Sequence, residues 1–155
     1  MFDGVFRKSH IKITPVLALI MATQNCLSAD FNVICSGQNY STTSISSTES
    51  NDGPETKTFR LVDNKINNML NCPIANENQG MCTLQAKLPD GVTVFYVVTI
   101  NRVSGQIEEV TTTETPRAVA LRDTPQLAPF LGGIAMLKVT RTFKGSCKKS
   151  NSNKF

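Results

Sequence analysis

The most restrictive feature of this 155-residue sequence is a central block in which two turn signals separate three β-rich segments. Residues 82–88 (CTLQAKL) lead through Pro89-Asp90-Gly91 into residues 92–101 (VTVFYVVTIN), and a second turn at 102–105 leads into residues 106–113 (QIEEVTTT). Proline presets the backbone angle φ of a turn and glycine accepts positive φ, so the Pro-Asp-Gly sequence predicts a tight hairpin. The block as a whole predicts an antiparallel meander of three strands.

Alternation of apolar and polar residues extends the β prediction to both sides of this block. Further candidate strands are 31–36, 56–63 and 134–143. In the segment 92–101 both faces are largely apolar, so we expect that strand to be central and covered on both sides. The predicted fold class is therefore mainly β, an antiparallel meander or a small barrel or sandwich, with little helix apart from the N-terminal segment.

Three other segments lack clear strand patterns. Eight of the ten residues 41–50 are Ser or Thr, and such a tract cannot bury a core by itself, so we predict a Ser/Thr-rich loop at about 37–55. An exposed Ser/Thr-rich edge strand is the alternative. Four Asn in residues 64–71 favour a connection, and the Pro-rich segment 125–133 predicts a short helical or irregular cap over an open barrel end.

The first 29 residues have the pattern of an export signal. Basic side chains precede an apolar run at 13–22, and the polar stretch that follows ends at Ala29. A run of about ten apolar residues is too short to span a bilayer. We therefore predict cleavage near Ala29, one domain over residues 30–155 with no transmembrane segment, and a periplasmic or secreted location in bacteria.

The four Cys that remain after cleavage are Cys35, Cys72, Cys82 and Cys147. An even number of Cys in an exported domain predicts two disulfides, with three possible pairings. We prefer Cys72–Cys82, which closes a short loop, together with Cys35–Cys147, which joins the two ends of the domain. A zinc site needs closer Cys pairs than the spacings of 37, 10 and 65 residues provide.

Removal of the signal also restricts the chemistry that is available. It takes away the only His and leaves 13 of 16 basic and 11 of 12 acidic side chains. A domain without His cannot perform Ser-His-Asp or Cys-His catalysis. Glu108 and Glu109 are adjacent on a strand and point to opposite faces, so they cannot serve together as the carboxylate pair of a glycosidase. We expect no catalytic residue, cofactor or metal, and a hydrolase that works without His is an alternative.

Basic side chains gather after Asp123, and no acidic residue follows it. Lys144, Lys148 and Lys149 are candidates for contact with anionic components of the bacterial envelope. A solvated basic tail is the alternative explanation. Few aromatic residues lie among these lysines, so we expect no nucleic-acid partner.

A β domain of this size can also close into a small barrel that holds one apolar ligand. Phe95, Tyr96, Phe130 and Phe143 are candidates to line such a cavity, and the alternative is that they form the core. The sequence favours an exported binding or envelope accessory protein that is not an enzyme, with an apolar-ligand carrier as the second possibility.

Two short motifs, 101–105 (NRVSG) at a strand end and 145–147 (GSC) before the closing Phe155, resemble a group of small exported bacterial proteins of unknown function. The resemblance implies a periplasmic β-meander or small barrel and supplies no activity. It implies that Asn101, Arg102 and Gly105 are structural turn residues, because glycine accepts positive φ and arginine bonds strand-end carbonyls or a carboxylate.

Overall fold

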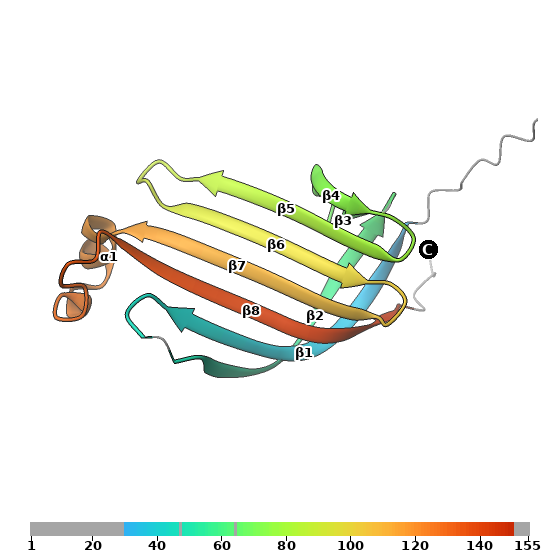
Figure 1. The fold of residues 1–155 in the computed structure, drawn as a ribbon, viewed down its shortest axis with the longest axis horizontal. Helices are drawn as coiled ribbons and strands as arrows, with labels where there is room; N and C mark the ends of the chain where they lie inside the picture. Colours follow the sequence, from blue (N-terminus) through green and yellow to red (C-terminus); the bar gives the residue numbers. More distant parts are fainter. Residues whose placement is uncertain (1–29, 47, 64, 151–155) are drawn as a thin grey trace, which may run out of the picture.

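The computed structural model describes residues 30–46, 48–63 and 65–150, which form one antiparallel sheet curled into a nearly closed barrel (Figure 1). The order of the strands in the sheet is β3-β2-β1-β8-β7-β6-β5-β4. The predicted mainly β fold class is therefore confirmed. The strands are β1 (Phe31–Thr43), β2 (Ser50–Val62), β3 (Lys65–Ile66), β4 (Asn71–Ala75), β5 (Gln79–Lys87), β6 (Thr93–Asn101), β7 (Gln106–Pro116) and β8 (Met136–Lys149).

The predicted meander is present as strands β5, β6 and β7, each paired antiparallel with the next. At the Pro-Asp-Gly hairpin the backbone N–H of Leu88 donates to the carbonyl of Val92 at 2.8 Å. The described part of the Asn-rich segment, 65–71, is mainly a connection, as expected: it has positive φ at Asn67 and Asn68, and its strand residues are the two of β3 and Asn71, which begins β4.

The Ser/Thr-rich tract forms strands, so the predicted loop at about 37–55 is wrong. Strand β1 continues to Thr43 and β2 begins at Ser50, so only six residues separate the two strands. Strand β1 also pairs with β8 along this tract, so it is not an edge strand either. The tract needs no core of its own because two neighbouring strands satisfy its backbone hydrogen bonds and Thr has a good β propensity.

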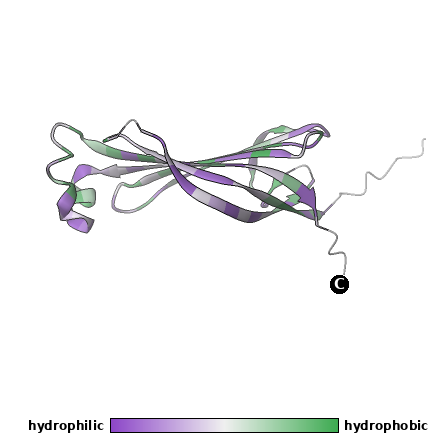
Figure 2. Cartoon of the chain, turned by 90° about the horizontal axis from the view of Figure 1, so that it is seen from below, coloured by the Kyte–Doolittle hydropathy of each residue, from purple (hydrophilic) through white to green (hydrophobic). Residues whose placement is uncertain are grey.

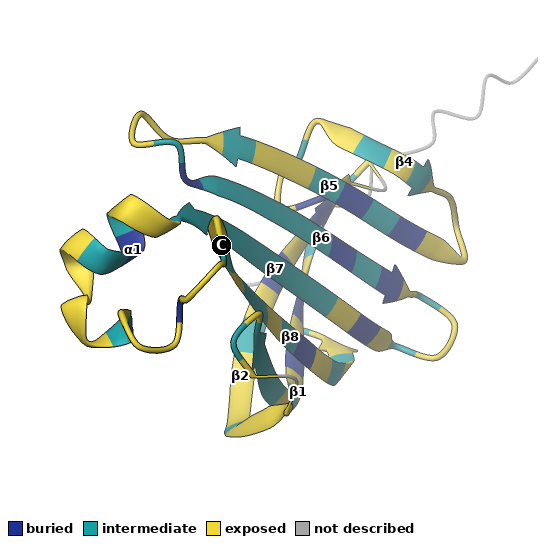
Figure 3. Cartoon of the chain, turned by 60° about the vertical axis from the view of Figure 1, so that its left-hand side comes forward, coloured by how far each residue is buried: buried dark blue, intermediate teal, exposed yellow. Residues whose placement is uncertain are grey.

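The hydrophobic core fills one end of the barrel, where buried positions lie along the inward faces of the strands (Figure 3). Ile66 of β3 lies beside Gly80 of β5 there, so the two edges of the sheet approach each other. The buried cluster consists of Val33, Cys35, Phe59, Leu61, Ile66, Cys82, Val98, Ile100, Ile107 and Phe143.

Both predicted disulfides are formed at this end. Cys35 and Cys147 face each other in the register of β1 and β8 and are joined, although 112 residues separate them in the chain. Cys72 is joined to Cys82, which links β4 to β5. The pairings therefore fasten neighbouring strands of the sheet to each other.

The expectation that the middle strand of the meander is covered on both sides is wrong. Val98 and Ile100 of β6 face inward and are buried. Phe95 and Val97 alternate with them and are only half-buried, because the described residues form one sheet and no second layer covers its outer face.

The open end of the barrel carries the connection between β7 and β8. It holds a 3₁₀ turn at Pro125–Leu127, within the segment 125–133 predicted to be short helical or irregular, and the helix α1 (Arg117–Asp123), which the sequence did not predict. Ala120 and Leu131 are buried within this connection. In the view of Figure 2 it lies at one extreme of the long axis of the sheet.

A close approach of β1 and β8 requires glycine at position 37. A Cβ atom on Gly37 would clash with the carbonyl oxygen of Lys144. We expect Gly37→Ala to lower the free energy of unfolding by about 2 kcal/mol, the scale of overpacking against a backbone that cannot move freely, measured by urea denaturation. Gly133→Ala is the matched control, because a Cβ atom there would meet no described atom within 4 Å. Equal losses for both variants would contradict this account.

Candidate functional site

A polar hollow of about 490 Å³ opens on the concave face of the sheet, next to the hydrophobic core. Strands β1, β2, β7 and β8 supply its lining. The inward-facing side chains of these strands change from apolar to polar at this level. The lining residues are Asn39, Asp52, Glu55, Lys57, Glu109, Thr111, Arg141 and Phe143.

Lys57 occupies the centre of this lining. Its Nζ lies 2.5 Å from Oε2 of Glu109 and 3.4 Å from Oε2 of Glu55, and it lies 4.9 Å from the ring centroid of Phe143. Strands β2 and β7 are separated in the sheet by β1 and β8, so the contact between Lys57 and Glu109 crosses the concave interior. The curl of the sheet thus produces an ion pair over the face of an aromatic ring, where a cation is stabilised further.

The acidic wall of the hollow is held in place by neighbouring polar groups. Asn39 donates from Nδ2 to Oε2 of Glu55 at 2.7 Å, and Ser41 donates from Oγ to Oδ1 of Asp52 at 3.1 Å. The hydrogen bond from Asn39, with a smaller contribution from Lys57, lowers the pKa of Glu55. The register of β1 against β2 shifts at this level, where Asp52 is the extra residue of the bulge.

Arg141 of β8 lines the same hollow. It faces Thr111 in the register of β7 and β8, and it also lines a smaller hollow of about 270 Å³ together with Thr111, Thr113 and Val139. Within the part of the chain that the structure describes, Arg141 forms no ion pair. Its guanidinium group is therefore available to hold a carboxylate or phosphate group in two parallel hydrogen bonds.

Tyr96 of β6 lies on the same face and packs against the core. Burial raises the pKa of its hydroxyl far above the usual value, and the charge and hydrogen bonding of Glu109 contribute to the increase. The raised pKa means that the folded protein favours the protonated form of Tyr96.

This shift predicts a loss of stability at high pH. An unfolded tyrosine has a pKa of about 10, so the stabilising contribution of protonated Tyr96 is complete below about pH 10 and decreases as the pH rises further. We expect Tyr96→Phe to reduce the decrease in unfolding free energy above that pH, measured by urea denaturation across the alkaline range. A Tyr40→Phe variant, in which Tyr96 is the remaining tyrosine, allows ionisation to be followed by absorbance. Ionisation of Tyr96 near pH 10 in the folded variant would contradict the assignment.

The predicted basic contact residues do not form one group. Lys144 lies 3.6 Å from Glu108 on the outer face, whereas Lys149 lies 5.1 Å from the ring centroid of Phe31. Lys148 is exposed, and strand alternation places it on the face opposite Lys149. Strand β8 thus distributes the three lysines over both faces. Lys148 and Lys149 line a shallow hollow of about 410 Å³ with Ile34, Ser36, Ser146 and Ser150.

The four aromatic residues proposed to line an apolar cavity are also separated. Phe143 is buried in the core, and Tyr96 packs against it from the same face. Phe95 points to the outer face, and Phe130 is 61% exposed in the connection after the 3₁₀ turn. These four residues therefore do not share one cavity, and of the four only Phe143 is a buried core residue.

The adjacent acids and the predicted turn residues lie as expected. Glu109 meets Lys57 inside the barrel, whereas Glu108 meets Lys144 outside it. Asn101 accepts hydrogen bonds at Oδ1 from the backbone N–H groups of Val103 and Ser104 at 3.0 and 2.9 Å.

Gly105 completes this turn with a φ of 72°. Its carbonyl accepts a hydrogen bond from the N–H of Cys147 at 2.7 Å, which fastens the turn to β8. The Nε and Nη2 atoms of Arg102 are buried, and burial lowers the pKa of this side chain. The backbone N–H of Arg102 donates to the carbonyl of Asn78 at 2.8 Å, so the turn also contacts the β4–β5 connection.

Sequence reasoning did not identify Lys57, Glu55 or Asn39 as site residues. The available signal was the position of Lys57, which shares a strand face with the apolar Phe59 and Leu61. A charged residue on the inward face of a half-buried strand needs a partner inside the fold.

Two features of the described residues concern the surroundings in which the chain folds. Among the described residues, no helix is long and apolar enough to cross a membrane. The two disulfides indicate that the chain folds in an oxidising compartment.

Comparison with known proteins identifies no relative of this chain. No family model matches the chain, and no curated protein or solved structure matches it.

Proposed function

We propose that this protein is an exported, non-catalytic binding domain whose concave hollow holds a small polar ligand that carries both a positive and a negative group. The observation that carries the proposal is that one hollow contains both a basic and an acidic group open to a ligand. Arg141 of β8, which has no ion pair among the described residues, lines the same hollow as Asp52 and Glu55 of β2. A ligand carboxylate fits the guanidinium group, and a ligand ammonium or hydroxyl group fits the free oxygens of the two acids.

The charge balance of the hollow selects this class of ligand. Three acids and two bases line it, and one acid and one base, Glu109 and Lys57, are matched with each other. A purely anionic ligand would meet net negative charge, and an apolar ligand would strip water from several charged groups. Free amino acids, short peptides and amino sugars that bear a carboxylate supply a group for Arg141 and a group for the acids.

The state of Lys57 and Tyr96 favours binding over catalysis. The Nζ of Lys57 forms ion pairs with Glu109 and Glu55, so this side chain is engaged in holding two carboxylates. Tyr96 is held protonated by burial. Both groups therefore stabilise the shape of the hollow in this proposal and supply no base or nucleophile.

The proposed location is the bacterial periplasm or the outside of the cell. Residues 1–29, which carry the predicted signal and the cleavage position near Ala29, lie outside the described residues, as does Phe155. The apolar run at 13–22 and the two disulfides support export. Contact of Lys144, Lys148 and Lys149 with anionic envelope components remains a separate proposal, best supported for the exposed Lys148.

Ligand-observed nuclear magnetic resonance tests the proposed binding. A panel of amino acids, dipeptides, acidic amino sugars and neutral sugars is screened against the wild type, Arg141→Ala and Lys144→Ala. Lys144 is on the same strand but faces outward, so it is the matched control. We expect zwitterionic compounds to bind the wild type and Lys144→Ala, and Arg141→Ala to bind at least about tenfold more weakly because a charge-assisted hydrogen-bonded contact is lost. The proposal fails if no zwitterion binds or if Arg141→Ala, with an unchanged melting temperature, binds as well as the wild type.

A further inference from the structure

Part of the connection between β7 and β8, together with the start of β8, forms an uncharged tip at one end of the molecule. Residues 124–137 (TPQLAPFLGGIAML) contain no Asp, Glu, Lys or Arg. In Figure 1 this segment lies at the end of the sheet opposite residues 30 and 150, which end the described chain. Phe130 in the tip is 61% exposed, and Leu88 in the β5–β6 hairpin is 47% exposed. Exposed aromatic and aliphatic side chains at one extreme of a domain indicate an interaction site.

The tip has a defined local structure that holds Phe130 outward. The N–H groups of Phe130 and Leu131 both donate to the carbonyl of Leu127, at 2.9 and 3.1 Å, and the N–H of Ile134 donates to the carbonyl of Leu131 at 3.0 Å. Leu131 is fully buried. Leu131 therefore packs the segment against the rest of the fold, and the side chain of Phe130 lies in solvent.

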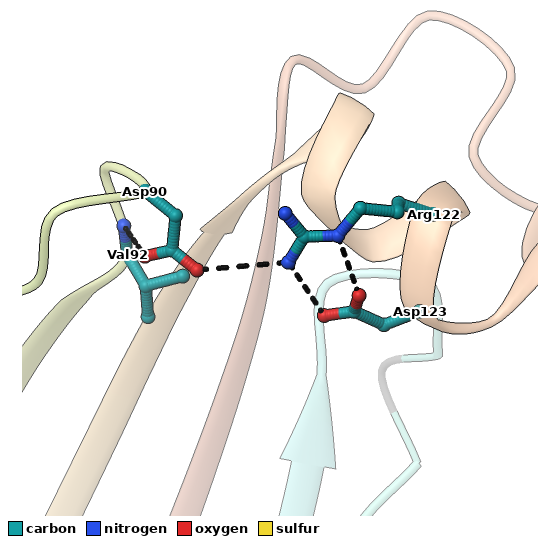
Figure 4. A network of polar contacts seen from close by, with 4 residues as sticks. All are labelled: Asp90, Val92, Arg122 and Asp123. Atoms are coloured by element: carbon teal, nitrogen blue, oxygen red, sulfur yellow. Dashed lines mark hydrogen bonds and ion pairs between the residues drawn. The ribbon is translucent and has the colours of Figure 1, made fainter.

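Basic and acidic side chains border the tip, and only some of them form ion pairs. Arg122 donates from Nε to Asp123 at 2.8 Å, and its Nη2 lies 3.8 Å from Oδ2 of Asp90 (Figure 4), so one arginine serves both acids. Within the described ranges, the exposed Lys87 and Arg117 form no ion pair. Counting Lys87, Arg117 and Arg122 against Asp90 and Asp123, the border of the tip has three basic and two acidic side chains, a net charge of +1, and its two cations without an ion pair are Lys87 and Arg117.

We propose that this tip docks on the surface of an anionic phospholipid bilayer. Phe130 and Leu88 enter the boundary between headgroups and acyl chains, and Lys87 and Arg117 contact the headgroup phosphates. Charge complementarity selects this occupant, because anionic lipid presents negative groups directly above an apolar layer, in the same order as the bordering cations and the apolar tip. The hollow on the concave face is not involved, so this inference is independent of the proposed ligand.

The chain contains no Trp, so a single introduced Trp reports its own surroundings. Phe130→Trp places the probe in the tip. Leu70→Trp is the control, because Leu70 is 93% exposed and precedes β4 at the other end of the sheet (Figure 1). With vesicles of phosphatidylglycerol and phosphatidylethanolamine, we expect the emission of Phe130→Trp to shift to shorter wavelength and to be quenched by brominated lipid. Leu70→Trp should show neither effect, and vesicles of phosphatidylcholine alone should bind much less.

Charge variants test the second part of the proposal. In vesicle cosedimentation we expect Lys87→Glu with Arg117→Glu to lower the partition coefficient at least about tenfold, since each basic residue near an anionic surface contributes about a fivefold effect. Arg60→Glu with Lys65→Glu, an equal change of charge on exposed residues of β2 and β3 at the opposite end, should bind as the wild type does. The proposal is overturned if Phe130→Trp shows no shift with anionic vesicles, if Leu70→Trp shifts instead, or if the shift depends on protein concentration without vesicles, which would indicate a second copy as the occupant.

Discussion

Removal of the Cys35–Cys147 disulfide is expected to lower the free energy of unfolding by about 5 kcal/mol in the chain-entropy description, the largest effect of any change considered. The bond closes a loop of 112 residues that includes nearly every strand of the sheet. Without it, the unfolded chain gains the conformational freedom of that loop, and only the pairing of β1 with β8 joins β1, β2 and β3 to the rest of the sheet. Urea denaturation of a Cys35→Ala, Cys147→Ala variant measures the loss.

The second disulfide supplies the control for this experiment. Cys72–Cys82 closes a loop of 10 residues, so the same description gives about 3 kcal/mol for its removal. Both pairs lie against the same core, so the comparison separates loop length from packing. A loss for the Cys35–Cys147 pair that is no larger than the loss for Cys72–Cys82 would contradict the proposed role of the long loop.

Replacement of Lys57 by Met is expected to lower the free energy of unfolding by about 3 kcal/mol, because it leaves the carboxylate of Glu109 without its partner. The side chain of Glu109 is only 12% exposed, and it lies beside the apolar core. Methionine keeps most of the volume of lysine, so the change tests charge and not packing. Urea denaturation at neutral pH measures the effect.

The double variant Lys57→Met, Glu109→Gln provides the internal control. It removes both charges, so no uncompensated charge remains, and it should recover at least about half of the lost stability. Single and double variants with equal losses would show that the Lys57–Glu109 pair contributes through packing alone. Lys144→Met, which breaks an exposed contact with Glu108, should change stability by less than about 1 kcal/mol.

Local patterns made much of the fold predictable. Alternation in the meander and the Pro-Asp-Gly hairpin depend on residues that are close in sequence, and the structure has strands β5, β6 and β7 there. The Cys72–Cys82 pairing is also local. The strand nature of the Ser/Thr tract was not predictable in this way, because β1 is ordered by pairing with β8, about 100 residues later, at contacts such as that between Thr42 and Thr140.

The polar hollow was hidden from the sequence for the same reason. Lys57 and Glu109 lie 52 residues apart, on strands that are not neighbours in the sheet. Their contact requires the curl of the whole sheet, which no local pattern specifies. Strand alternation did predict that Glu108 and Glu109 face opposite ways, but only the complete topology identifies the partner of each.

The most direct test of the proposed binding site is to map amide chemical shifts during titration with the tightest zwitterionic compound of the panel. The account predicts that the largest changes occur on four strands around the hollow, at Asn39, Glu55, Thr111 and Arg141, while Phe95 and Val97 on the outer face of β6 change little. Changes that centre on the outer face or on the tip at 124–137, with the amides around the hollow unaffected, would contradict the account.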